Sequence, residues 1–183
     1  MDNSAPKKKM TINELVLAWV EDEYCYVPIF MIQQLAKIRP LDKVGIKNLL
    51  GMIQSAGYNS QSVLTLRAPL VRKHVRFTSD DKKAQLAGNW VKPWTEKEEE
   101  QWANDGFASL YGCVDGAHRL VVLEILRDMP SHPTYDKYFL APVVILRKNI
   151  PEALVIAIAS RKKPFPYVGQ LGNQEAALCL LSS

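Results

Sequence analysis

The alternation of hydrophobic and polar residues predicts a helix and then a strand at the start of the chain. Thr11 and Glu14 form a capping box, and the apolar residues that follow recur at helical spacing, which predicts a helix over residues 12–22. Residues 24–33 are rich in β-branched and aromatic side chains and predict a strand. Pro28 lies inside this stretch and indicates an edge strand or a bulge.

The same patterns continue along the chain. From Val44 the apolar residues trace one face of a helix, and Gly57 lies where a left-handed C-terminal cap is expected. Farther on, the pattern predicts strands over residues 62–66, 110–114 and 138–146, a helix from 118 or 119 to 128, and a helix that begins near residue 152. The helix that ends at residue 128 is apolar almost all round, so we expect it to be deeply packed.

Residues 67–109 form the least regular part of the chain and read as an insertion. Its basic residues outnumber Asp80 and Asp81; they are Arg67, Arg72, Lys73, Arg76, Lys82 and Lys83. The basic stretch 67–83 is either a solvated face or a surface for nucleic-acid phosphates. Thr95 and Glu98 form a capping box that predicts a short acidic helix.

Three tryptophans lie in the same insertion, namely Trp90, Trp94 and Trp102. Indole rings either stack on nucleic-acid bases or bury a large apolar area in the protein. The second alternative predicts that these side chains attach the insertion to the body of the protein.

Composition limits the class of protein without identifying a function. The 183 residues are 48% hydrophobic and 23% charged with a net charge of +4, which is typical of a globular domain. We expect a disordered basic tail over residues 1–10 and a single domain over residues 11–183. Cys25, Cys113 and Cys179 lack metal-ligand spacing, so neither a disulfide framework nor a zinc site is indicated. No leader or membrane span is recognisable, so we expect an intracellular protein, cytoplasmic or nuclear, with no membrane partner.

The stretch VDGAHR, residues 114–119, carries the candidate chemistry. A strand that turns into a buried helix leaves the first N–H groups of that helix without partners. Gly116 and Ala117 add little bulk, and His118 and Arg119 bring hydrogen-bond donors and positive charge. These features predict an anion site, and a phosphate group is the natural ligand. A purely structural alternative makes Asp115 the N-cap and His118 an interior histidine.

On these residues the chain resembles the ParB/sulfiredoxin superfamily. GCVDGAHRLVVLEIL is similar to its phosphate-binding strand, turn and helix, and residues 37–66 and 141–163 are similar to the segments on either side. The resemblance implies an α+β fold with a small mixed sheet flanked by helices, interrupted by the basic, Trp-rich insertion. It further implies that Gly116, Ala117, His118 and Arg119 bind phosphate together with Arg161. Arg39, Gly57 and Tyr58 would line the cleft.

The chain departs from the family at three points that matter for chemistry. Sulfiredoxin-like reduction needs a cysteine where this chain has Ala117. The acid and amide of the family's ENxxR box align with Ala157 and Ile158, so a carboxylate that helps to hold Mg²⁺ is missing and CTP hydrolysis does not carry over. The helix-turn-helix region that follows in chromosome-segregation members is also missing.

The sequence leaves three hypotheses about function open. The first is a domain that binds a nucleoside triphosphate, ATP or CTP with or without Mg²⁺, as an NTPase or a phosphotransferase in which Asp115 and His118 are the candidate catalytic residues. The second is a DNA-binding, RNA-binding or nuclease-like module that uses residues 67–83. The third is a degenerate domain that serves as an interaction scaffold.

Overall fold

The computed structural model describes residues 10–35, 40–73 and 75–160. Six α-helices occur in this part of the chain: α1 (Ile12–Leu17), α2 (Lys43–Ala56), α3 (Ser79–Leu86), α4 (Glu96–Asn104), α5 (Ala117–Arg127) and α6 (Glu152–Ala159). Five strands accompany them: β1 (Val20–Pro28), β2 (Ile32–Gln34), β3 (Leu64–Arg67), β4 (Tyr111–Asp115) and β5 (Leu140–Leu146). Short 3-10 helices, η1 (Ile29–Met31), η2 (Gly106–Ser109) and η3 (Pro133–Tyr135), connect them.

The five strands form one mixed sheet in the order β1-β5-β3-β4-β2. β1 pairs with β5 and β3 with β4 in antiparallel fashion, whereas β3 with β5 and β2 with β4 are parallel. Helices and a mixed sheet in one chain confirm the predicted α+β class. β4 lies next to the edge strand β2, so the turn that follows it is close to one side of the sheet.

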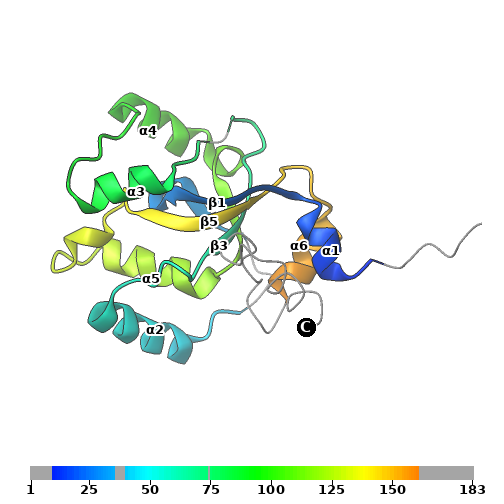
Figure 1. Cartoon of the computed structure of the whole chain (residues 1–183), viewed down its shortest axis with the longest axis horizontal. Helices are drawn as coiled ribbons and strands as arrows, with labels where there is room; N and C mark the ends of the chain where they lie inside the picture. The colour runs from blue at the N-terminus through cyan, green and yellow to red at the C-terminus, as the bar shows by residue number, and fades with distance from the viewer. Residues whose placement is uncertain (1–9, 36–39, 74, 161–183) are drawn as a thin grey trace, which may run out of the picture.

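Helices pack on both sides of the strands (Figure 1). In the figure α2 and α5 lie together below the sheet, α3 and α4 lie above it, and α1 and α6 lie together at one end. Successive side chains of β5 point to opposite faces of the sheet, so this strand contributes to two hydrophobic cores. Val143 and Ile145 belong to the main core. Leu146 belongs to a second core with Val155 and Ile158 of α6.

Most of the predicted elements are confirmed. The helix that ends at Gly57 is α2; Gly57 is its C-cap with φ +81°, which favours glycine, but its ψ of 167° is not that of the predicted left-handed cap. The strands predicted over residues 62–66, 110–114 and 138–146 are β3, β4 and β5, and the predicted acidic helix is α4. α5 and α6 also form where the pattern places them.

The prediction of a helix over residues 12–22 is wrong at its C-terminal end. α1 has the predicted capping box at Thr11, but it ends at Leu17, and Val20 already pairs with Leu146 of β5. The backbone N–H of Arg147 donates to the carbonyl of Trp19, which continues the strand pairing to the end of the helix. Pairing with a distant strand outweighs the local helical spacing here.

The prediction of one strand over residues 24–33 is also wrong in detail. The chain forms β1 on one edge of the sheet, turns through η1, and then forms β2 on the opposite edge. Pro28 ends β1, and it has no N–H with which to continue the ladder. The prediction that Pro28 lies in an edge strand is therefore confirmed.

The insertion is more regular than predicted, because it contains α3 as well as α4. α3 begins with a capping box in which Thr78 and Asp81 exchange hydrogen bonds. It is fixed to β5 by Gln85, whose side chain donates to the carbonyl of Tyr138 (2.8 Å) and accepts the N–H of Leu140 (3.0 Å).

An aromatic cluster attaches the insertion to the body of the protein, as the packing alternative for the tryptophans predicts. Trp94 is 5% exposed and is the central ring of the cluster. Its neighbours are Phe30, Phe77, Trp90, Trp102 and Tyr138, with ring centroids 5.2 to 6.4 Å from that of Trp94. The Nε1–H group of Trp94 donates to Glu99 (2.9 Å), so the buried indole also has a polar partner.

Lys82 of α3 places a partly buried charge between this helix and the start of β5. Its Nζ donates to the carbonyl of Leu140 (2.9 Å) and lies 3.6 Å from the centroid of the Phe139 ring. Burial lowers the pKa of Lys82 to about 8 from the ordinary 10.5. Below about pH 8 the side chain is charged in the folded protein, and its burial lowers the free energy of unfolding. This destabilisation disappears as the pH rises from about 8 towards 10.5, because the folded protein then holds the neutral amine.

We therefore predict a pH-dependent difference between the wild type and Lys82→Met. The stability of the variant relative to the wild type should fall by about 1–2 kcal/mol between about pH 7 and about pH 10, because only the wild type is relieved of the buried charge. Urea unfolding at several pH values measures this difference. Lys83→Met is the matched control, since Lys83 is exposed and its difference from the wild type should not change with pH. If the stability difference between Lys82→Met and the wild type did not change with pH, the lowered pKa of Lys82 would be contradicted.

Candidate functional site

The turn between β4 and α5 holds four of the five predicted phosphate-binding residues, 116–119. Gly116 is the N-cap of α5 and has φ +94°, and its N–H donates to Oδ1 of Asp115 (2.9 Å). The alternative in which Asp115 is itself the N-cap is therefore wrong, because the carboxylate binds the residue before the helix. A β-carbon on Gly116 would lie 2.6 Å from Cδ2 of Leu64, so this position requires glycine for space as well as for conformation.

Arg119 folds back over the start of its own helix. A β-carbon on Gly116 would lie 3.2 Å from Nη2 and 3.4 Å from Cζ of Arg119, which places the half-buried guanidinium directly beside the turn. Helical side chains point towards the N-terminus, and this direction explains the approach. Among the described residues Arg119 makes no ion pair. The positive end of a helix and an arginine side chain thus meet at one place.

The backbone of the turn adds further donors. The N–H groups of Ala117, His118 and Arg119 have no acceptor within the part of the chain that the structure describes. The first residues of a helix cannot bond within the helix, so these groups are available to an anion or to water.

His118 holds the start of α2 against the turn. Its Nε2 accepts the backbone N–H of Asp42, the N-cap of α2, at 2.9 Å. Because Nε2 is the acceptor, the ring proton of the neutral imidazole is on Nδ1. This hydrogen bond connects the start of α5 to the start of α2 beside the turn.

Tyr58 lies near Arg119, whereas Gly57 is on the outer surface. Burial raises the pKa of Tyr58 to about 12, although the positive charge of Arg119 acts in the opposite direction. The phenol donates to the carbonyl of Ser62 (2.6 Å), and the backbone N–H of Tyr58 donates to the hydroxyl of Tyr135 (2.9 Å). The segment after α2 is therefore fixed in place beside the turn.

Cys113 lies on β4 just before the turn and is buried. Burial raises the pKa of its thiol to about 12, so the reactive thiolate is disfavoured. In the part of the chain that the structure describes, no group of three or more acidic, histidine or cysteine side chains could hold a metal ion.

Two predicted site residues, Arg39 and Arg161, lie outside the described residues. The residues that align with the missing acid and amide of the ENxxR box are on α6. Ile158 is 1% exposed and packs against Val114 and Leu146, so that position contributes to the core.

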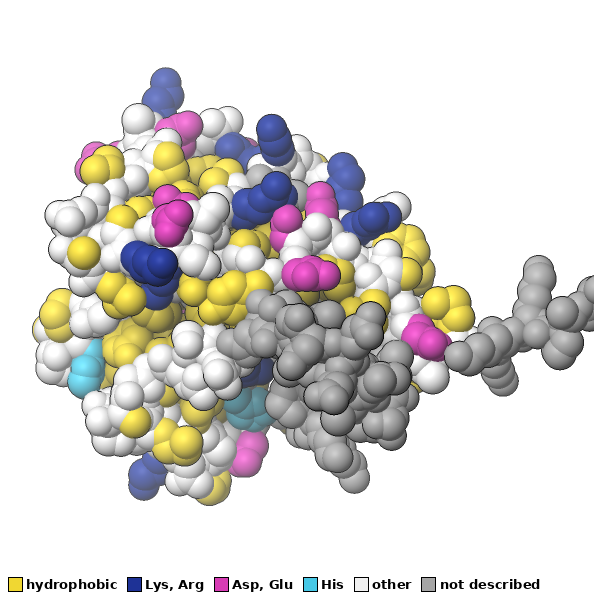
Figure 2. All heavy atoms as spheres, in the orientation of Figure 1, with side chains coloured by type: hydrophobic (Ala, Val, Ile, Leu, Met, Phe, Trp, Pro, Cys, Tyr) yellow, Lys and Arg dark blue, Asp and Glu magenta, His cyan; other side chains and the backbone are white. Residues whose placement is uncertain are grey.

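The basic stretch 67–83 is largely neutralised by ion pairs. Arg67 pairs with Glu152, Arg72 with Asp105, Arg76 with Asp22, and Lys83 with Asp80. On the face shown in Figure 2, lysine and arginine side chains are interspersed with acidic ones and do not form one continuous patch. The nucleic-acid alternative therefore remains a prediction that the charge arrangement does not favour.

Two neighbours of the turn were not predicted. Gln34 of β2 donates from Nε2 to the carbonyl of Ala117 (3.1 Å), and the backbone N–H of Asp42 binds His118. Both are polar residues at the end of one element and the start of another. The sequence near Gln34 gives no indication of this contact, and near Asp42 it indicates only that an aspartate is a suitable N-cap for α2.

Comparison of the chain with protein-family models, curated proteins and solved structures finds no match. The structure therefore defines the class directly: an α+β protein with a five-stranded mixed sheet and a tryptophan-rich aromatic cluster. Within the described residues, no helix is both long and apolar enough to cross a membrane.

Proposed function

We propose that the chain is a ParB/sulfiredoxin-like domain that binds the phosphate groups of a nucleotide at the turn between β4 and α5. The observation that carries the proposal is the position of Arg119, whose guanidinium lies beside Gly116 without an ion pair among the described residues. A cation near a helix N-terminus is unfavourable by about 0.3–1 kcal/mol, and a bound anion would offset this because it interacts favourably with both the cation and the helix N-terminus.

Each residue of the turn has a separate role in the proposed binding of phosphate. Gly116 allows an oxygen atom to come close to the backbone, and the N–H groups of Ala117 and His118, which lack an acceptor among the described residues, serve the same ligand. Arg119 supplies charge and paired donors. His118 and Gln34 position the turn, because they bind the start of α2 and the carbonyl of Ala117. These contacts support binding, and they do not by themselves indicate hydrolysis or transfer of a phosphate group.

A thermal-shift panel tests the proposal, with ATP, ADP, CTP, GTP and inorganic phosphate, each with and without Mg²⁺. At about 100 times its dissociation constant, a nucleotide should add about 2.7 kcal/mol to the free energy of unfolding, because only the folded state has the turn. The shift should change little with salt, since a single nucleotide displaces few counterions. No shift with any nucleotide at saturating concentration would contradict the proposal. A steep loss of nucleic-acid binding with salt would favour the nucleic-acid alternative.

A further inference from the structure

A second candidate site lies between the insertion and the segment before β5. A cleft of about 500 Å³ is lined on one side by residues of α3 and the loop after it, and on the other by residues of η3 and the turn into β5. Its lining includes Leu86, Trp90, Lys92, Tyr138 and Phe139. It shares no residue with the turn between β4 and α5. The volume is in the range of small-molecule sites, about 300–1,000 Å³.

Three aromatic side chains, Trp90, Tyr138 and Phe139, are among the ten residues that line this cleft. Trp90 is half-buried, and its ring is held edge-on by Phe77 and Trp94 at centroid distances of 5.7 and 5.8 Å. Its indole N–H has no acceptor among the described residues, unlike that of Trp94. Tyr138 and Phe139 add two rings from the opposite wall. Flat, rigid walls of this kind suit a planar aromatic ligand, since ring stacking adds to the burial of apolar area.

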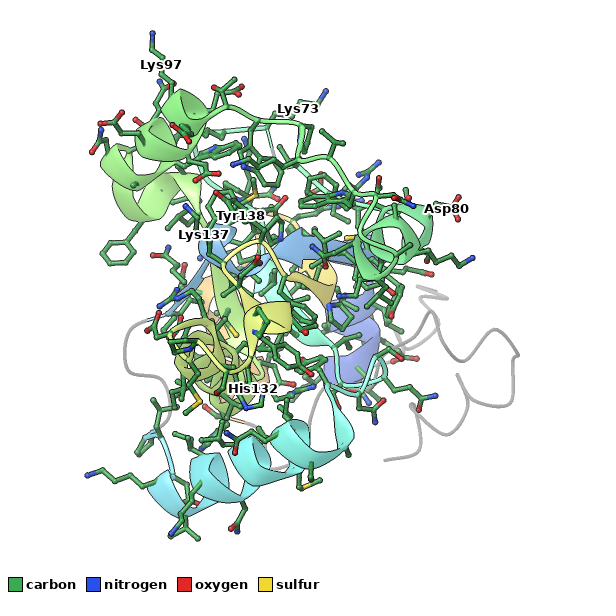
Figure 3. All side chains as sticks on the ribbon, turned by 90° about the vertical axis from the view of Figure 1, so that its left-hand side faces the viewer. Lys73, Asp80, Lys97, His132, Lys137 and Tyr138 are labelled. Atoms are coloured by element: carbon green, nitrogen blue, oxygen red, sulfur yellow. The ribbon has the colours of Figure 1, made fainter. Side chains whose placement is uncertain are left out.

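The charged groups in and around the cleft carry an excess of positive charge. Lys92 donates to Glu99 (3.1 Å) and to the hydroxyl of Tyr138 (3.0 Å), and its Nζ lies 4.4 Å from the centroid of the Tyr138 ring. Lys137 donates to the other oxygen of the same Glu99 (2.8 Å) and also lies over the Tyr138 ring. Figure 3 shows Lys137 and Tyr138 side by side on this face. Two ammonium groups thus share one carboxylate.

The remaining charges do not reverse this excess. Asp136 lines the cleft, but it is exposed, and its Oδ1 accepts the backbone N–H of Tyr138 (2.9 Å). Lys82 is a third ammonium group, in contact with the lining residues Gln85 and Phe139. Of these charged residues only Lys92 and Asp136 line the cleft itself. With Lys82, Lys137 and Glu99, which contact lining residues, three ammonium groups stand against two carboxylates in and around the cleft, which favours an anionic ligand.

We propose that this cleft binds a small planar aromatic carboxylate, with the ring against Trp90 and Tyr138 and the acid group towards Lys92. The Nζ of Lys92 has three donors, and two of them are used by Glu99 and Tyr138. The third donor and the indole N–H of Trp90 are the groups that the ligand's acid would engage. This proposal does not depend on nucleotide binding at the other site.

Ligand-detected NMR and calorimetry with naphthoate, on the full chain, test the proposal. Naphthoate should bind with a dissociation constant on the order of 1 mM or below, as expected for a ligand of this size. Its neutral analogue naphthylmethanol and its saturated analogue decalin carboxylate should each bind about tenfold more weakly or worse, because one lacks the charge and the other the planar ring.

Variants locate the binding on the protein. Lys92→Gln and Trp90→Leu should each weaken naphthoate binding about tenfold or more. Lys97→Gln is the matched control, because Lys97 points away from the cleft on α4 in Figure 3, and its affinity should equal that of the wild type. Equal binding of naphthoate and naphthylmethanol would overturn the proposal even if Lys92→Gln failed to fold. Unchanged affinity in both cleft variants, or no binding of naphthoate, would also overturn it.

Discussion

Arg119→Ala is expected to weaken nucleotide binding by about 10- to 100-fold and to leave the free energy of unfolding almost unchanged. A hydrogen bond to a charged group contributes about 1.5–3 kcal/mol, which corresponds to this loss of affinity. Stability should hardly change, because the half-buried side chain makes no ion pair with the described residues. Calorimetric titration gives the affinity, and urea unfolding of the same samples gives the stability.

The matched control for this variant is on the same helix. Arg127 is in the last turn of α5 and pairs with its neighbour Asp128, so Arg127→Ala should bind nucleotide as the wild type does. Arg119→Lys keeps the charge but loses the planar pair of donors, and it should have intermediate affinity. If Arg119→Ala binds as tightly as the wild type, the turn is not the phosphate site.

Trp94→Ala is expected to cause the largest loss of stability of any substitution proposed for this chain. Removal of a fully packed tryptophan costs about 3–5 kcal/mol, and Trp94 is the central ring of the cluster between the insertion and the body. It also leaves Glu99 with one donor fewer. Burial alone would raise the pKa of this carboxyl, but hydrogen bonds from Lys137, Tyr138, Lys92 and Trp94 together lower it to about 2.

Denaturant unfolding followed by circular dichroism measures this loss. Val91→Ala is a suitable control, because Val91 is 83% exposed in the same loop and should change stability by about 0.5 kcal/mol or less. Trp94→Phe should lie between the two, since it retains a ring but loses the N–H. A loss below about 1 kcal/mol for Trp94→Ala would show that the cluster does not hold the insertion to the body.

Local patterns predicted the elements around the candidate site well. α5 and β4 were expected within one or two residues, because a buried strand and a helix that is apolar on most sides leave clear periodicities. The choice of Gly116 as a close-approach residue also came from the sequence, and its φ of +94° explains it. The spacing of Gly116 and Arg119 by three residues puts both on one face of the turn, and this too is a local property.

Contacts between distant segments could not be predicted in this way. The strand partner of residues 20–22 is Leu146 and its neighbours, and no local pattern near α1 indicates that pairing. The same applies to the bond between His118 and Asp42 and to the ion pairs of the basic stretch, such as Arg76 with Asp22. α3 was missed although its Thr78 capping box was present, because a helix without a buried residue leaves no apolar periodicity.

The most direct test of nucleotide binding at the turn is an amide NMR titration of the full chain with ATP or CTP. The largest chemical-shift changes should fall on the N–H groups of Gly116, Ala117 and His118 and on the side-chain Nε–H of Arg119, and inorganic phosphate should move the same signals at higher concentration. Changes confined to other parts of the chain, or none at saturating nucleotide, would contradict the proposal that this turn binds phosphate.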